Sequence, residues 1–237
     1  MFSLSKLIST LFAITMFGQS GGGAKVLALM TSPYAEGLFD KGIVQSGATE
    51  TMGVVFNSQE ASTALTENIL EILGITGENI EDIQTVPVDE LQAAASQALR
   101  QTGEELQIPA SLGGGYSMDW EPVVDGDFLP TNPVTEDSFA EAGRDIPLLI
   151  GSNLNEWSGF FGSAPVEETQ EQEALAEQIS TAWINFARNG VPSADGLPTW
   201  EPYTREGGAT MILDTEPELV YHHDQALMEL LAPEYEY

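Results

Sequence analysis

The chain has 237 residues, 42% of them hydrophobic, and 37 acidic against 7 basic residues give a formal net charge of −30. This length and apolar share predict one folded domain with a substantial core and argue against a disordered chain. The charge argues against nucleic acid or an anionic membrane as a partner. It indicates an ordinary acidic, soluble protein, and adaptation to high salt is the alternative.

The first 17 residues allow two interpretations. One lysine precedes a mostly apolar run from Leu7 to Phe17, a pattern that a secretory signal peptide also has. The run is too short to span a bilayer, and signal cleavage after the small residues that follow would remove or expose Ser20. We favour a strand at residues 13–17 and leave residues 1–12 unassigned, with a signal-like segment or a start artefact as the alternatives.

The sequence Gly18-Gln19-Ser20-Gly21-Gly22 predicts a sharp turn between a strand and a helix. Residues 13–17 are apolar and partly β-branched, and residues 22–30 predict a helix whose positive end lies beside Ser20. A Gly-x-Ser-x-Gly pattern in this setting is typical of a nucleophile elbow, which holds the serine at its apex in a strained backbone conformation. Side chains two residues to either side would collide across the turn. A serine in a glycine-rich helix start is the alternative.

Two helices and a loop are expected next. Apolar residues at helical spacing across residues 58–73, followed by a glycine, predict the first helix. Pro87 and two acidic residues in the next turn indicate that the second helix covers residues 87–99. Residues 101–119 are polar and glycine-rich, and they predict a loop in which the glycines at 113–115 form a flexible connector.

The second half of the chain begins with a short apolar run at residues 146–150, which predicts a buried parallel strand. Glu156 follows this strand after a short polar loop. In α/β folds, functional groups gather beyond the carboxyl ends of the strands, which gives this position meaning. The remaining expected elements are a helix, a strand and a closing helix, at residues 171–189, 211–213 and 224–231.

Several blocks of the chain resemble the type-B carboxylesterases, the branch of the α/β-hydrolases that includes para-nitrobenzyl esterases and cholinesterases. The longest block, residues 13–48, contains the elbow and the sequence Gln45-Ser46-Gly47. Further blocks follow in the family's order, at residues 120–126, 146–156, 182–190 and 197–203. The resemblance implies an α/β-hydrolase fold over residues 13–237, with an incomplete, mostly parallel sheet and flanking helices. It also implies hydrolysis of a small-molecule carboxylic ester.

Two parts of that family have no counterpart here. One is everything before the elbow, including several sheet strands and a His-Gly-Gly-Gly loop that supplies part of the oxyanion hole. The other is the loop with the catalytic histidine, because residues 157–179 contain no histidine. The chain therefore resembles an internally shortened piece of an esterase.

The resemblance assigns roles to four residues. Ser20 would be the nucleophile, and Gly21 would donate its backbone N–H to the oxyanion of the tetrahedral intermediate. Glu156 matches the acid that orients the histidine. Ser46 matches a serine that hydrogen-bonds this acid, and a capping role is the alternative for it.

His222 and His223 are the two histidines of the chain. Both follow Ser20 and Glu156, so chain order alone permits one of them as the base. They lie beyond the helix at residues 171–189, where the family has no catalytic residue, and surface or helix-start histidines are favoured. The absence of cysteine excludes disulfides and thiolate metal sites, and two histidines argue against a histidine metal cluster. The implied reaction needs neither a metal nor an organic cofactor.

A second hypothesis belongs to a different class of function. The chain would then be a non-catalytic cholinesterase-like binding domain or an inactive truncated gene product. The missing histidine loop favours this hypothesis, whereas the elbow and the acid favour an enzyme. We expect a soluble protein without a membrane span, secreted if the signal-peptide interpretation holds. The substrate and the oligomeric state stay open.

Overall fold

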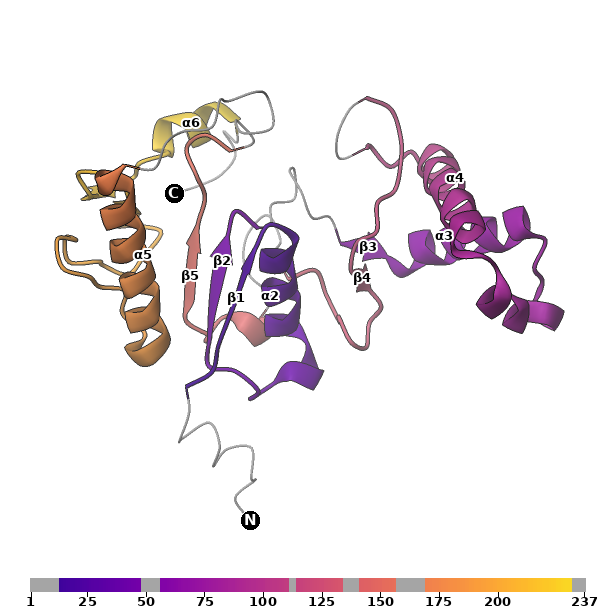
Figure 1. Ribbon diagram of the computed structural model, residues 1–237, viewed down its shortest axis with the longest axis horizontal. Helices are drawn as coiled ribbons and strands as arrows, with labels where there is room; N and C mark the ends of the chain where they lie inside the picture. Colours follow the sequence, from indigo (N-terminus) through magenta and orange to yellow (C-terminus); the bar gives the residue numbers. More distant parts are fainter. Residues whose placement is uncertain (1–12, 48–55, 111–113, 134–140, 157–168, 232–237) are drawn as a thin grey trace, which may run out of the picture. The chain divides into compact units, whose positions relative to one another are not determined.

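The computed structural model of the chain describes residues 13–47, 56–110, 114–133, 141–156 and 169–231 (Figure 1). Residues 1–12, left unassigned above, lie outside the described residues, as do residues 157–168 of the interval without histidine. The described residues from Thr15 to Leu154 form one compact unit. Those from Asn155 onward form a second unit, together with Ala13 and Ile14. The assignment of residues 13–237 to one domain stays a prediction.

A three-stranded parallel sheet lies in the first unit. Its strands, in spatial order, are β1 (Thr15–Gln19), β2 (Lys41–Gln45) and β5 (Leu148–Gly151). β1 and β5 both pair in parallel with β2, so the carboxyl ends of all three strands lie at one edge of the sheet. The two strands predicted at residues 13–17 and 146–150 are confirmed, each displaced toward the C-terminus by one or two residues. The predicted architecture of a mostly parallel sheet with flanking helices is confirmed.

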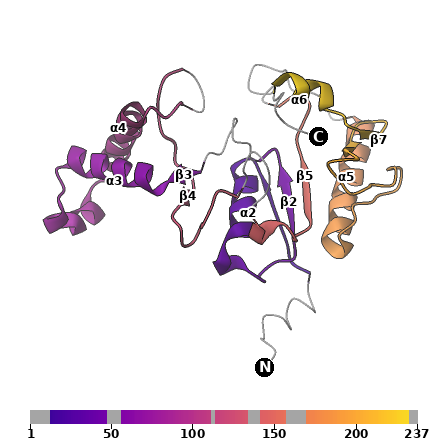
Figure 2. The ribbon, with the colours of Figure 1, turned by 180° about the vertical axis from the view of Figure 1, so that it is seen from behind.

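Helix α2 (Gly21–Thr31) begins directly after β1 and packs against β1 and β2, as both views show (Figures 1 and 2). Its buried side chains form the core of this part of the molecule with side chains of β2 and of the segment between them. Leu27 of α2 and Val44 of β2 are each only 1% exposed. The full cluster is Val26, Leu27, Met30, Ala35, Phe39 and Val44.

Helices α3 (Gln59–Leu73) and α4 (Val88–Leu106) pack against each other around a second apolar cluster. Ser58 caps α3 by accepting the N–H of Ala61, and α3 ends at the left-handed Gly74. A 3₁₀ segment, η2 (Gly77–Thr85), joins the two helices. The short strands β3 (Asn57–Ser58) and β4 (Val123–Val124) pair in parallel beside them.

The prediction that a loop begins at residue 101 is wrong, because α4 continues to Leu106. Thr102 is fully buried, and its hydroxyl accepts a hydrogen bond of 2.9 Å from the Asn68 side-chain amide on α3. A Cβ on Gly103 would lie 2.3 Å from the Ser117 Cα, so glycine lets the returning chain pack on the helix. Tertiary packing therefore extends the helix through residues whose polarity alone favours a loop.

The second unit contains α5 (Gln170–Asn189), β6 (Ala209–Ile212), β7 (Glu218–Tyr221) and α6 (Gln225–Leu231). α5 begins with a capping box between Thr169 and Gln172 and ends at the left-handed Gly190. β6 and β7 form an antiparallel hairpin. The helices and the late strand predicted for this region are confirmed, and β7 was not predicted. No helix among the described residues is both long and apolar enough to cross a bilayer.

We expect the thermal unfolding midpoint to rise as salt is added. A formal charge of −30 repels itself in the folded state, and counterions screen this repulsion. β1 is an outer strand of the described sheet and its Phe17 is 75% exposed, so aggregation should compete at high salt. Circular dichroism melts from low to molar salt, with light scattering in parallel, measure both effects. A midpoint that does not change with salt would show that charge does not limit stability.

Candidate active site

Ser20 lies at the turn between β1 and α2, with φ 53° and ψ −128°. A positive φ is disfavoured for residues other than glycine and marks local backbone strain. Two backbone hydrogen bonds hold this conformation. The Ser20 N–H donates to the Gln45 carbonyl at 2.9 Å, and the Ser20 carbonyl accepts the Gly23 N–H at 2.8 Å. The predicted strand, turn and helix are confirmed.

The Ser20 hydroxyl does not cap α2, although Ser20 occupies the N-cap position. Serine at this position usually accepts a backbone N–H of the first turn. Here Ser20 does not have the extended backbone conformation usual at this position, and its hydroxyl is not used by the helix. This is the arrangement that a nucleophile requires.

The glycines of the elbow do not contribute equally. A Cβ on Gly18 would lie 2.2 Å from the carbonyl carbon and oxygen of Gly22, so the predicted collision across the turn is confirmed for Gly18. The same prediction is wrong for Gly22, where an added Cβ has nothing within 4 Å, because this position points away from the turn. Gly23 is crowded instead, since its Cβ would lie 2.9 Å from the Gly47 Cα and from a Val44 methyl.

The end of β2 joins the elbow to β5. Ser46 also has a positive φ, of 48°, and its N–H donates to the Gly151 carbonyl at 2.8 Å. The contact described for Ser46 is thus a backbone contact, and the predicted role of its hydroxyl stays a prediction. Gly47 then packs against the elbow backbone, a contact that was not predicted. The Gln45-Ser46-Gly47 sequence gives no sign of it, because a close approach between backbones has no signature in one sequence beyond glycine itself.

The start of α2 is an electropositive environment. The first N–H groups of a helix lack intrahelical acceptors and carry its positive dipole end. Gly21 is the first helical residue, and α2 has no acidic residue in its first turn. Lys25 adds a positive charge one turn further, where its ammonium donates to the Gly21 carbonyl at 3.2 Å. The N–H of Gly21 is therefore well placed to donate to an anion that forms beside Ser20.

Glu121 lies close enough to Lys25 for their charges to interact. Burial raises the pKa of the Glu121 carboxyl, the neighbouring Asp119 raises it further, and Lys25 opposes both.

Glu156 lies in a turn five residues after the end of β5 and belongs to the second unit. It follows the strand whose carboxyl end shares an edge with the end of β1, as expected for the acid. Its role as the acid stays a prediction.

His222 and His223 follow β7 and lie two and one residues before Asp224, after which α6 begins, so they are near the helix start where they were expected. His222 has φ 52°, and its Nδ1 is buried without a hydrogen-bond partner among the described residues. His223 is exposed, with its Nδ1 2.8 Å from the Asp224 carboxylate. Within the described ranges, no group of three or more potential ligand side chains could hold a metal ion.

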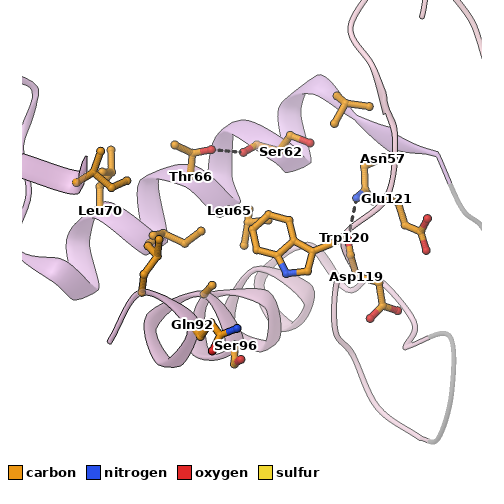
Figure 3. Close-up of a pocket in the computed structure, with 15 residues that line it drawn as sticks. Asn57, Ser62, Leu65, Thr66, Leu70, Gln92, Ser96, Asp119, Trp120 and Glu121 are labelled. Carbon is orange, nitrogen blue, oxygen red and sulfur yellow. Dashed lines mark hydrogen bonds between the residues drawn. The ribbon is translucent and has the colours of Figure 1, made fainter. Parts of the chain in front are cut away.

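A groove of about 750 Å³ lies between α3, α4 and residues 119–123 (Figure 3). Its walls are mostly apolar, and the indole of Trp120, 67% exposed, lies over it. The Asn57 side-chain amide donates to the Asp119 carbonyl at 3.1 Å and holds this segment in place. The groove contains none of the predicted site residues, and it was not predicted.

Comparison with known proteins adds to this geometry. The sequence profile described as the carboxylesterase family matches residues 12–164. The chain belongs to the carboxylesterase family. It is 33% identical over 202 residues to the para-nitrobenzyl esterase of Bacillus subtilis (strain 168). The aligned segment covers 80% of this chain and 38% of that protein. It is 30% identical over 175 residues to the fumonisin B1 esterase of Sphingopyxis macrogoltabida, covering 72% and 28% respectively.

Solved structures agree on the fold. A para-nitrobenzyl esterase structure superposes with a TM-score of 0.70 at 22% identity, over 92% of this chain and 63% of that one. A thermophilic para-nitrobenzyl esterase gives a TM-score of 0.71 at 21% identity, over 92% and 62%. The predicted α/β-hydrolase fold is therefore confirmed. The chain spans well under half the length of either of the two sequence relatives named above.

We expect Gly18→Ala to destabilise the fold and Gly22→Ala to leave it intact. The Gly18 methyl would overlap the Gly22 backbone, at a cost of about 1–3 kcal/mol or more. The Gly22 methyl meets nothing, and alanine favours a helix over glycine by up to about 1 kcal/mol. Urea unfolding of both variants measures the difference. Equal stability of the two variants would contradict this account of the elbow.

Proposed function

We propose that the chain carries the nucleophile and the acid of a serine carboxylesterase. The observation that carries the proposal is the strained backbone of Ser20 between a parallel strand and the positive end of a helix. Such strain persists only where the surroundings impose it, and it is common at functional sites. Membership of the carboxylesterase family supports the same reaction.

In the proposed reaction, the Ser20 Oγ attacks the carbonyl carbon of a carboxylic ester. The oxyanion of the tetrahedral intermediate accepts a hydrogen bond from the Gly21 N–H. The alcohol leaves and the acyl group stays on Ser20 as an ester. Water then attacks this acyl-enzyme, releases the acid and restores the hydroxyl.

The proton of the Ser20 hydroxyl needs a base, and the base needs an orienting acid, which we assign to Glu156. The family's histidine loop has no histidine here, since residues 157–179 contain none. His223 is already paired with Asp224. The His222 ring is packed against Gly208, and the backbone N–H of His222 donates to the Gly208 carbonyl at 3.0 Å. The nucleophile and the oxyanion donor are thus supported better than the base.

A non-catalytic carboxylesterase-like domain is the second candidate function. The observation that favours it is the missing base, because residues 157–179, where the family carries its histidine, contain none. In that case the elbow would be retained as a structural feature of the sheet.

We expect weak labelling of Ser20 by a fluorophosphonate probe. The elbow presents the hydroxyl beside an oxyanion donor, but without a placed base it ionises poorly. Mass spectrometry of the labelled chain locates the adduct, and Ser20→Ala should abolish it. Ser32→Ala is a matched control, because Ser32 is a buried serine just after the end of α2. Labelling that survives Ser20→Ala would reject Ser20 as the nucleophile.

We expect hydrolysis of a short p-nitrophenyl ester close to the uncatalysed rate. A triad without a working base loses most of its acceleration, and only a small part remains from the oxyanion hole and substrate binding. Initial rates of the wild type and of Ser20→Ala measure what remains. Robust turnover would show that a base is present, and His222→Ala and His223→Ala would identify it.

A further inference from the structure

Gly47 contacts the backbone of the elbow from the neighbouring strand. It is buried and follows β2 by two residues. A Cβ at this position would lie 2.5 Å from the Ser20 carbonyl oxygen and 2.8 Å from the Gly23 Cα. Both are backbone atoms, so a side-chain rotation cannot relieve the overlap.

Hydrogen bonds to neighbouring strands hold the end of β2, on which Gly47 lies, in place. β2 is the central strand of the three, hydrogen-bonded on both sides. The residue before Gly47 is tied to β5 by the Ser46 N–H to Gly151 carbonyl bond of 2.8 Å. The carbonyl of Gln45, two residues before Gly47, accepts the Ser20 N–H at 2.9 Å. A side chain at residue 47 would therefore displace the elbow rather than β2.

The Ser20 carbonyl oxygen links the contact with Gly47 to the nucleophile and the start of α2. It accepts the N–H groups of Gly23 and Ala24, at 2.8 and 3.3 Å, and so defines where α2 begins. Pushing this carbonyl moves both the Ser20 side chain and the first N–H groups of the helix, including that of Gly21.

We propose that Gly47 is a positioning residue for Ser20. Because Gly47 has no side chain, the elbow can pack against the end of β2, and this contact determines the positions of the nucleophile and the oxyanion donor. The proposal rests on the proposed function for its catalytic meaning. A displacement of about 1 Å at a reacting group can lower the rate on the order of 100-fold.

The experiment uses the absence of cysteine from the chain. Ser20→Cys introduces one thiol at the elbow, whose alkylation by iodoacetamide needs no triad base and no ester. A helix N-terminus lowers the pKa of an adjacent thiol, so the pH profile of alkylation reports its distance from α2. The profile is measured in the Ser20→Cys background alone and with Gly47→Ala added.

Gly42→Ala in the same background is the matched control. Gly42 is a buried glycine of the same strand, and its Cβ would lie 3.1 Å from side-chain carbons of Leu148 and Val26, away from the elbow. We expect Gly47→Ala to raise the apparent thiol pKa and therefore to lower the alkylation rate at neutral pH by about 10-fold or more. We expect Gly42→Ala to leave the profile unchanged whatever it does to the melting midpoint. A folded Gly47→Ala protein with the parent profile would overturn the proposal.

Two further outcomes are decisive. If Gly47→Ala gives no cooperative melt, Gly23→Ala replaces it, because its Cβ would lie 2.9 Å from the Gly47 Cα. Failure of both to fold while Gly42→Ala folds would make this contact a folding requirement and overturn the positioning role. Fluorophosphonate labelling of the wild type separates the two proposals. An unlabelled wild type with a Gly47-dependent thiol profile rejects the esterase and keeps the positioning contact.

Discussion

The hydrogen bond from the Ser20 N–H to the Gln45 carbonyl, 2.9 Å long, is the constraint on which the site depends. It continues the pairing of β1 and β2 by one residue beyond the last paired position and forces the chain to turn there. The next residue must begin α2, because the Ser20 carbonyl is already occupied by the Gly23 N–H. The serine is thus held between a sheet edge and a helix start, with its hydroxyl unused by either.

This conformation has a cost that the surrounding core offsets. A non-glycine residue in a sparsely populated backbone region costs about 1–3 kcal/mol. Full burial of one large apolar side chain contributes about 1.5–3 kcal/mol, and α2 buries Leu27, Val26 and Met30 against the sheet. The packing of α2 is therefore sufficient to hold the elbow, which explains why the strain is tolerated at Ser20. The same argument applies to Ser46, whose positive φ is held by the carbonyl of β5.

Much of the fold was predictable because its signals are local. Apolar runs indicated β1 and β5, caps and periodicity indicated α3 and α5, and the glycine pattern indicated the elbow. The extension of α4 past residue 101 was not predictable, since it depends on Thr102 meeting Asn68 from another helix. β7 is only four residues long, with Leu219 and Val220 as its two aliphatic residues, and this run is too short to predict a strand from sequence alone. For the site, the motif indicated Ser20 and Gly21, whereas the contact of Gly47 depends on two strands meeting.

The charge distribution along the sequence is consistent with the proposed role of the elbow in stabilising an oxyanion. Of the 37 acidic residues, only Glu36 and Asp40 lie within the first 47 residues, the segment that contains β1, α2 and β2. Carboxylates in the first turn of α2 would oppose the development of an oxyanion beside Ser20, and none is present there. Lys25 acts in the opposite direction, because its ammonium lies against the Gly21 carbonyl. A chain with a net charge of −30 thus keeps its acidic residues, in sequence, away from the helix start where a negative charge would have to form.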